Sequence, residues 1–286
     1  MILLIKQDCI GSKHKMKLAF TTLGCPDWNL EKIVSTAHEL GFDGVEIRGL
    51  EGKISAKEIE RFQEENREST KRLFAKNKLE LCGFGSSVCF HDPDTWNEML
   101  EEGRQTIDIC ASMGIPHLRV FGDRIPDRSR LKETQMQIIK GFKLLCEYAA
   151  GKSVDILFET HRDFNSIETI GPIVQAMQNE SQFGILWDVA AIDMVYGDDY
   201  TLFYNTVKQC LRFVHLKDHK RIGDEFVLCE MGEGDIPIKD IVKTLTQNGY
   251  EGYLSFEWEK KWHPELPDAS EAFPAFIQYM HFLHEN

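Results

Sequence analysis

The sequence predicts a single α/β domain of the (β/α)8, or TIM-barrel, type. From Met16 onward, short apolar runs alternate with longer amphipathic stretches, which is the pattern of a parallel sheet with helical crossovers. Eight such strand-helix units fit in the remaining chain of about 270 residues, the size of a closed eight-stranded barrel. The first strand-helix turn lacks the GxGxxG loop that a doubly wound open sheet often carries, and no linker divides the chain.

The first four units begin at residue 17. Asp27 can cap the first helix, which ends near Leu40, before Gly41. The second helix is long and charged, and Gly114 and Pro116 stop the third helix. The expected strands and helices are, in order, 17–21, 27–40, 44–47, 55–76, 79–84, 95–113, 117–121 and 131–150.

The last four units repeat the pattern, and Gly151 separates them from the fourth helix. A long loop is expected after the seventh strand, and its Gly232-Glu233-Gly234 segment indicates a tight left-handed bend more than a phosphate loop. The expected strands and helices are 156–159, 166–178, 183–188, 200–208, 211–215, 238–248, 253–257 and 268–283.

Composition narrows the function classes. The 33 basic and 46 acidic residues give a formal net charge of -13, which disfavours nucleic-acid binding because phosphates require a basic surface. The charge favours a small-molecule substrate. Eight cysteines are present without a CxxC pair, and most lie in apolar runs, which indicates reduced core thiols in a cytoplasmic protein. A homo-oligomer is compatible with the sequence.

The first 15 residues precede a second methionine, Met16, and are expected to form an N-terminal extension outside the barrel of residues 16–286. Their short apolar run has no basic region before it and no small-residue cleavage site after it, so we do not expect a signal peptide. No apolar run in the sequence reaches the length of a membrane span, and no membrane partner is expected.

Four consecutive predicted strands each end on a residue type that binds metals. These residues are Glu159, Asp188, His215 and Glu257. The carboxyl ends of neighbouring barrel strands open at the same mouth, so the four side chains are expected to converge there. Three carboxylates with one imidazole suit one divalent ion, namely Mn²⁺, Mg²⁺, Co²⁺ or Zn²⁺. Three carboxylates gathered without a cation would repel one another.

The alternative is that these are unrelated polar residues, satisfied by water or backbone where each strand stops. For any single position this alternative explains the residue as well as a metal site does. Four successive strands that each end on a ligand-type residue favour the metal site. Other residues near the predicted mouth have both structural and ligand-binding readings. His161 could touch substrate or orient a ligand, Arg119 could form an ion pair, and Trp187 could stack on a sugar or fill the core. Lys217 is a further candidate substrate contact beside the ligands.

These motifs, taken together, resemble the xylose isomerase-like barrels of the sugar isomerase/epimerase and endonuclease IV superfamily. The matching segments are Phe158-Glu159-Thr160-His161, Trp187-Asp188, Val214-His215-Leu216-Lys217-Asp218, Gly232-Glu233-Gly234-Asp235-Ile236-Pro237 and Ser255-Phe256-Glu257. The resemblance implies one divalent metal ion held by Glu159, Asp188, His215 and Glu257. It also implies a sugar or polyol isomerase or epimerase in which Glu159 and Glu257 transfer a proton through an enediolate.

Departures from the family pattern bear on the substrate. Ala191 and Asn165 stand where ketose 3-epimerases of the family carry a histidine and a glutamate, whereas Arg221 matches their substrate-binding arginine. The alternatives are therefore a keto-polyol dehydratase on the same site, an endonuclease IV-like phosphodiesterase, or a barrel that only binds its ligand. The endonuclease requires more histidines at the mouth than this sequence supplies.

Overall fold

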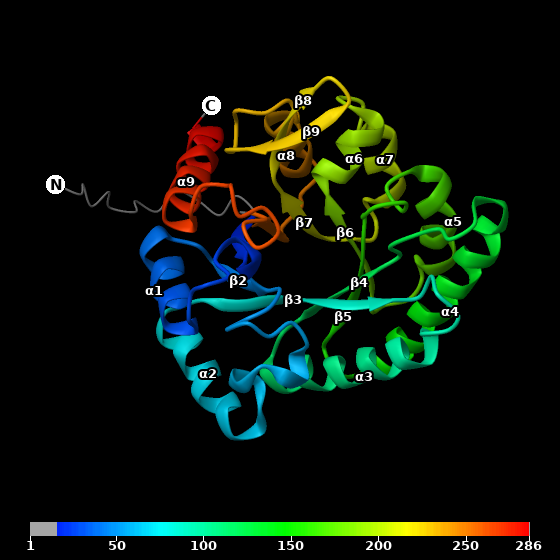
Figure 1. Cartoon of the computed structure of the whole chain (residues 1–286), viewed down its shortest axis with the longest axis horizontal. Helices are drawn as coiled ribbons and strands as arrows, with labels where there is room; N and C mark the ends of the chain where they lie inside the picture. Colours follow the sequence, from blue (N-terminus) through cyan, green and yellow to red (C-terminus); the bar gives the residue numbers. More distant parts are fainter. Residues whose placement is uncertain (1–15, 286) are drawn as a thin grey trace.

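Eight parallel strands close into a barrel in the computed structural model, which describes residues 16–285 (Figure 1). The hydrogen-bonded order around the ring is β1-β10-β7-β6-β5-β4-β3-β2, so the predicted (β/α)8 fold is confirmed. The barrel strands are β1 (Lys17–Thr21), β2 (Gly44–Ile47), β3 (Glu80–Cys89), β4 (His117–Phe121), β5 (Asp155–Glu159), β6 (Phe183–Asp188), β7 (Leu211–Leu216) and β10 (Tyr253–Phe256). The predicted extension over residues 1–15 lies outside the described residues.

Helices surround the barrel and cover its outer face (Figure 1). They are α1 (Leu30–Leu40), α2 (Glu64–Lys76), α3 (Trp96–Met113), α4 (Leu131–Ala149), α5 (Ile167–Met177), α6 (Val189–Tyr196), α7 (Thr201–Val207), α8 (Ile238–Gln247) and α9 (Ala269–Glu285). Within the described part of the chain, no helix is both long enough and apolar enough to cross a membrane. The cysteines described there are free thiols.

Two helix starts differ from the sequence prediction. Helix α1 begins at Leu30 instead of near Asp27, because the Asn29 side chain accepts the N–H of Lys32 at 2.9 Å and so caps the helix. The predicted helix over 55–76 forms only from Glu64. Before it lie two 3-10 turns, Ala56–Glu58 and Glu60–Phe62, separated by Ile59 in an extended conformation. Ala56, Ile59 and Phe62 are buried, and a 3-10 helix places residues at this three-residue spacing on one side.

The loop predicted after the seventh strand instead contains an antiparallel hairpin, β8 (Asp218–Ile222) with β9 (Glu225–Cys229). The first strand is mostly polar and each strand has only five residues, so the strand signal in the sequence is weak. The two-residue tip includes Gly223 at a φ of +62°. The hairpin lies at the edge of the molecule near α8 and α6 (Figure 1). It therefore borders the end of the barrel at which β6 and β7 terminate.

Strand alternation places the inner core directly below the predicted ligands. Leu157, Leu186 and Phe213 lie two residues before Glu159, Asp188 and His215, and so share their inward face. These three side chains form a buried cluster inside the barrel with Ala19, Cys82 and Tyr253. The cluster closes the barrel, so the site opens only toward the carboxyl ends of the strands.

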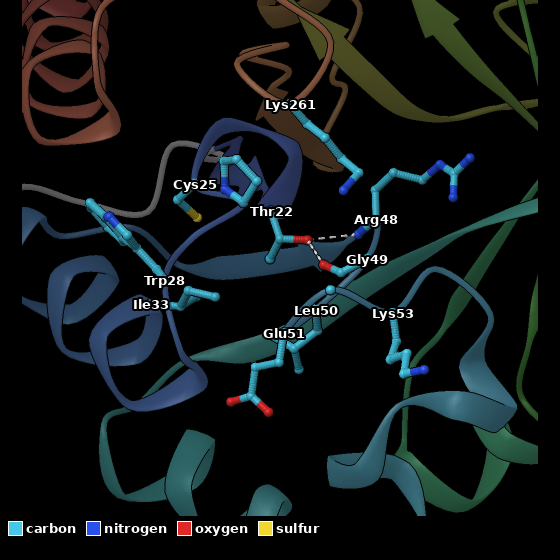
Figure 2. Close-up of a pocket in the computed structure, with 12 residues that line it drawn as sticks. Thr22, Cys25, Trp28, Ile33, Arg48, Gly49, Leu50, Glu51, Lys53 and Lys261 are labelled. Carbon is cyan, nitrogen blue, oxygen red and sulfur yellow. Dashed lines mark hydrogen bonds between the residues drawn. The ribbon is translucent and has the colours of Figure 1, made fainter. Parts of the chain in front are cut away.

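The loop that follows β2 is tied to the end of β1 through Thr22. The Thr22 hydroxyl accepts the backbone N–H of Arg48 at 2.9 Å and donates to the carbonyl of Gly49 at 2.6 Å (Figure 2). Gly49 has a φ of +89°, a conformation that favours glycine. These bonds fix the backbone from which the Arg48 side chain projects toward the mouth.

Asp218 organises the segment after the hairpin. Its buried carboxylate accepts backbone N–H groups from His219 at 2.9 Å, Gly232 at 2.9 Å, Gly234 at 3.0 Å and Ile236 at 3.4 Å. A β-carbon at Gly234 would lie 2.0 Å from a carboxylate oxygen, so only glycine fits there. Asp218 therefore has a structural role in the fold.

Asp218→Ala is expected to lower the free energy of unfolding by about 3 kcal/mol, because several buried N–H groups lose a charged acceptor together. Asp218→Asn, which keeps one oxygen, should cost about half as much. Urea unfolding followed by circular dichroism measures both values. Asp224→Ala, at the exposed hairpin tip, is the control, and an equal loss in that variant would contradict the role of Asp218.

Candidate metal and active site

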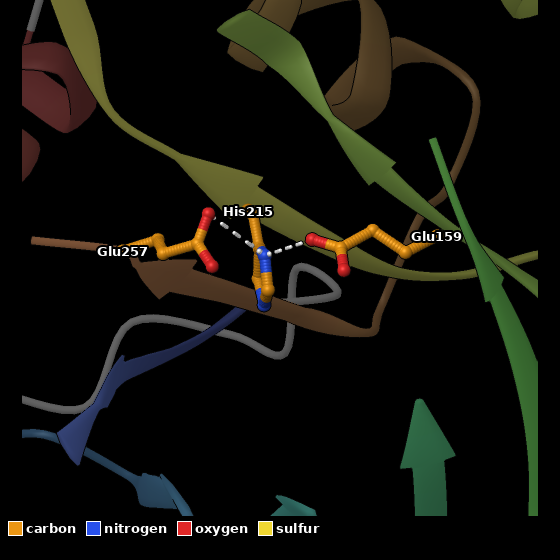
Figure 3. A group of neighbouring side chains, drawn as sticks. All are labelled: Glu159, His215 and Glu257. Atoms are coloured by element: carbon orange, nitrogen blue, oxygen red, sulfur yellow. Dashed lines mark hydrogen bonds and ion pairs between the residues drawn. The ribbon is translucent and has the colours of Figure 1, made fainter. Parts of the chain in front are cut away.

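Three of the four predicted ligands come together at the mouth of the barrel. Glu159, His215 and Glu257 are buried, and each offers a ligand atom within 4.8 Å of the other two. Glu159 is the last residue of β5, His215 is the last but one of β7, and Glu257 directly follows β10. Figure 3 shows the two carboxylates on opposite sides of the imidazole ring.

Nδ1 of His215 is the centre of this group. It lies 3.1 Å from Oε1 of Glu159 and 3.2 Å from Oε2 of Glu257 (Figure 3). Ligand atoms about 3 Å apart are what a divalent ion with bonds of about 2.1 Å gathers around itself. One nitrogen and two carboxylate oxygens, all buried and facing one another, therefore fit a divalent metal ion.

The other nitrogen of His215 is held by Glu46, at the end of β2. Nε2 lies 2.9 Å from Oε2 of Glu46, which also accepts the hydroxyl of Ser255 at 2.9 Å. A carboxylate behind a histidine fixes the ring orientation and leaves the opposite nitrogen for the metal. No signal in the sequence indicates this pairing, because the two residues are 169 positions apart.

Asp188 is not part of the three-residue group. The ammonium of Lys217 lies 3.0 Å from Oδ2 of Asp188 and donates to Glu257 and Glu259, each at 2.6 Å. The other oxygen of Asp188 accepts the N–H of Ala190 at 3.0 Å. In this structure the ammonium of Lys217 therefore lies between Asp188 and Glu257. Asp188 remains a proposed fourth ligand of the metal ion.

Arg119 lies buried beside Glu159. Its Nη1 donates to Oε2 of Glu159 at 2.9 Å, and its guanidinium stacks 3.8 Å from the centre of the Phe121 ring. The oxygen of Glu159 that faces His215 is the other one, so Arg119 orients the carboxylate without blocking its inner oxygen.

Burial favours the neutral form of every ionisable group in this network. A pKa shifted toward the charged form therefore shows that neighbouring charges and hydrogen bonds outweigh the effect of burial. Against burial, Arg119 and the hydrogen bond with His215 lower the pKa of Glu159 to about 2. His215 and Lys217 likewise hold the pKa of Glu257 well below its ordinary value. The carboxylates raise the pKa of His215 well above its ordinary value despite its burial. The three groups are therefore mutually stabilised as ions.

Two cavities meet above the group. One, of about 510 Å³, is lined by Glu159, Glu257 and Arg119 together with residues of the β2 and β3 ends. The other, of about 730 Å³, extends toward α6 and the hairpin and is lined by Asp188, among others. Both are bordered by the same four residues, His161, Arg162, Lys217 and Glu259. Together they offer the volume of a small-molecule site.

Three of the predicted substrate contacts border these cavities, and two do not. His161, Lys217 and Arg119 line them. Trp187 is fully buried and packs against Tyr200 and other aromatic rings of the helical layer, which is the core-filling role of the two that the sequence allowed. Successive side chains of a strand point to opposite faces. Because Asp188 points into the barrel, the preceding residue Trp187 points outward.

Arg221 also lies outside the cavity walls. Its guanidinium donates to Asp193 at 2.6 Å and is partly exposed on the hairpin. Asp193 in turn contacts Nε2 of His219 at 2.8 Å, and this pair ties the hairpin to α6. In this structure Arg221 therefore contacts protein, not the cavity. Asn165 and Ala191, the two departures from the family pattern, both line the larger cavity.

Residues 34–278 match the family described as xylose isomerase-like TIM barrel. The chain belongs to that family. A curated relative, the fructoselysine 3-epimerase of Shigella flexneri, is 21% identical over 251 residues, which is 85% of this chain and 90% of that protein.

Solved structures agree in fold. An IolI protein with a zinc atom superposes with a TM-score of 0.79 at 18% identity, covering 94% of this chain and 98% of that one. A D-psicose 3-epimerase with D-tagatose, from Clostridium cellulolyticum, gives 0.75 at 14% identity, covering 94% and 99%. The family resemblance expected from the sequence motifs is confirmed.

Replacing the central imidazole tests the metal site. His215→Gln is expected to weaken Mn²⁺ and Zn²⁺ binding on the order of 100-fold or more, because the only nitrogen of the group is lost. Isothermal titration of the chelator-treated protein measures the affinity, and circular dichroism checks that the barrel remains folded. An unchanged affinity would show that metals bind elsewhere.

Glu46→Gln tests the carboxylate behind the histidine. It should reduce metal affinity about 10- to 100-fold, since Glu46 orients the ring without touching the ion. Glu147→Gln, an exposed glutamate on α4, is the matched control and should bind metal like the wild type. A Glu46 variant indistinguishable from this control would contradict the assignment.

Proposed function

We propose that this protein is a metal-dependent sugar or polyol epimerase or isomerase. The observation that carries the proposal is the pair of buried carboxylates, Glu159 and Glu257, on opposite sides of His215 beneath a cavity. Its family membership and its similarity to a fructoselysine 3-epimerase support the same reading. The substrate class is a small carbohydrate or polyol.

Glu159, His215 and Glu257 would hold one divalent ion, with Asp188 as a fourth ligand. Mn²⁺, Mg²⁺, Co²⁺ and Zn²⁺ are all suited to this mixture of carboxylate and imidazole donors. When bound, the ion would polarise a substrate carbonyl and offset the negative charge of the enediolate.

The chain's own groups would move the proton. A substrate seated over His215 has one carboxylate on each side. Glu159 as the ion can take the carbon-bound proton from one face, and Glu257, once it carries a proton, can deliver that proton to the other face, which leaves Glu159 protonated and Glu257 ionised. Such a transfer inverts the carbon. If the same base returns the proton to the neighbouring carbon, the product is an isomer.

The remaining cavity residues would bind the substrate oxygens. Lys217 donates to Glu257 and Glu259 and lies where the two cavities meet, so its ammonium can also reach a substrate oxygen. His161 borders both cavities and faces Asp123 across 3.7 Å. Arg119 would keep Glu159 in place.

Solvent-exchange measurement tests the proposed chemistry. Mn²⁺-loaded protein is incubated in deuterium oxide with candidate ketoses, keto-inositols and their phosphate esters. Incorporation of deuterium beside the carbonyl, with an epimer or isomer as product, is the expected result. Loss of water from the substrate would instead identify a dehydratase. A ligand that binds without exchanging a proton for deuterium would indicate a barrel that only binds its ligand, and would refute the proposed chemistry.

The two carboxylates can be distinguished by separate variants. Glu159→Gln and Glu257→Gln should each reduce turnover by about two orders of magnitude or more, because the amide keeps the volume but cannot accept the proton. Deuterium wash-in and product formation are compared at matched metal content. Exchange that survives in one variant while epimerisation is lost assigns the remaining base, whereas near wild-type turnover in both would refute the proton-transfer roles.

A further inference from the structure

Arg48 is the one arginine lining the smaller cavity that no carboxylate in the described chain pairs with. Arg119 pairs with Glu159, and Arg162 pairs with Asp123 at 3.1 Å. Arg48 makes a single side-chain hydrogen bond, from Nη2 to the hydroxyl of Ser87 at 3.2 Å. Its Nη1 is buried and has no hydrogen-bond partner.

The acidic side chains near Arg48 are already engaged. Burial and the charge of Arg119 lower the pKa of Arg48 to about 10, and three carboxylates attract it only from a distance. Each of these carboxylates, Glu46, Glu159 and Glu257, contacts a closer cation, namely His215, Arg119 and Lys217 respectively. Within the described residues, Arg48 therefore has no carboxylate in direct contact with it.

The local structure holds this unpaired guanidinium in place. The backbone of Arg48 is fixed by Thr22, and Figure 2 shows its side chain projecting away from the β2 loop on the same side of that loop as Lys261. Gly85 of β3 makes room for it. A β-carbon at Gly85 would lie 2.7 Å from Cδ of Arg48 and 2.6 Å from Nη2 of Arg119. Two guanidinium groups thus pack over one glycine, and of the two only that of Arg119 contacts a carboxylate.

We propose that Arg48 and Ser87 form an anion subsite in the active-site cavity, and that the natural substrate carries a carboxylate or a phosphate group. This inference rests on the proposed function for the rest of the substrate. A guanidinium with a free, buried N–H recognises an oxyanion through charge-assisted hydrogen bonds. The exposed Ser87 hydroxyl supplies a further donor beside it.

The subsite lies in the same cavity as the proton-transfer pair. Arg48, Glu159 and Glu257 all line it, so one small molecule can reach both. A keto-sugar acid or a ketose phosphate has the required combination, with a reactive carbonyl at one end and an anionic group at the other. The neutral ketose lacks the group that would satisfy Arg48.

Matched ligand pairs test the subsite without catalysis. Isothermal titration of the chelator-treated protein compares D-fructose with D-fructuronate and with D-fructose 6-phosphate, at constant ionic strength. At least one charged ligand should bind about ten-fold or more tightly than D-fructose, the worth of hydrogen bonds to a charged group. Which of the two prevails separates a carboxylate from a phosphate substrate.

Arg48→Met removes the charge and keeps most of the carbon stem, so the preference for the charged ligand should disappear while D-fructose binding changes less than about two-fold. Arg48→Lys should restore part of the preference. Arg128→Met is the control, because Arg128 is exposed, pairs with Asp163 and lines neither cavity. Thermal melting confirms that each variant folds.

A wild type with no preference for either charged ligand, or an Arg48→Met variant that keeps the preference, would overturn the subsite. Either result leaves the exchange test of the epimerase proposal untouched. Conversely, a preference that depends on Arg48, with no deuterium exchange into any ligand, would refute the epimerase chemistry and leave the anion subsite standing.

Discussion

The site depends on one imidazole held between three carboxylates. His215 contacts Glu46 through Nε2 and both Glu159 and Glu257 through Nδ1, at distances between 2.9 and 3.2 Å. Because the ring is fixed from behind, its inward nitrogen and the two inner carboxylate oxygens face a common point. Metal binding and proton transfer would both use this arrangement, since the two carboxylates that would bind the ion would also flank the substrate.

The barrel supplies this geometry through strand alternation. Glu159 and His215 each stand two positions after a core residue on the same inward face, Leu157 and Phe213, so the packed interior determines the height of these two side chains. Cations then surround the carboxylates from above, with Arg119 on Glu159 and Lys217 on Glu257. Arg48 is the exception, because no carboxylate in the described chain contacts it, and its position in the cavity is the basis of the proposed anion subsite.

The fold and several site residues could be predicted from the sequence. The features that could not be predicted are contacts between residues far apart in the sequence. The strand ends at Glu159 and His215 were visible because an apolar run stops on a polar residue. Alternation would also have excluded Trp187, which adjoins the inward Asp188. In contrast, the pairing of Glu46 with His215 and the place of Lys217 beside Asp188 depend on how distant strands meet in the ring, which no local pattern encodes. The hairpin was missed because both its strands are short and the first is mostly polar.

The central claim is that one divalent ion binds between Glu159, His215 and Glu257. Diffraction from crystals grown with Mn²⁺, recorded near the manganese absorption edge, locates the ion directly. We predict one anomalous peak at bonding distance from Nδ1 of His215 and from an oxygen of each glutamate. A strong peak elsewhere in the molecule, with these three side chains still hydrogen-bonded to one another, would contradict the proposed metal site.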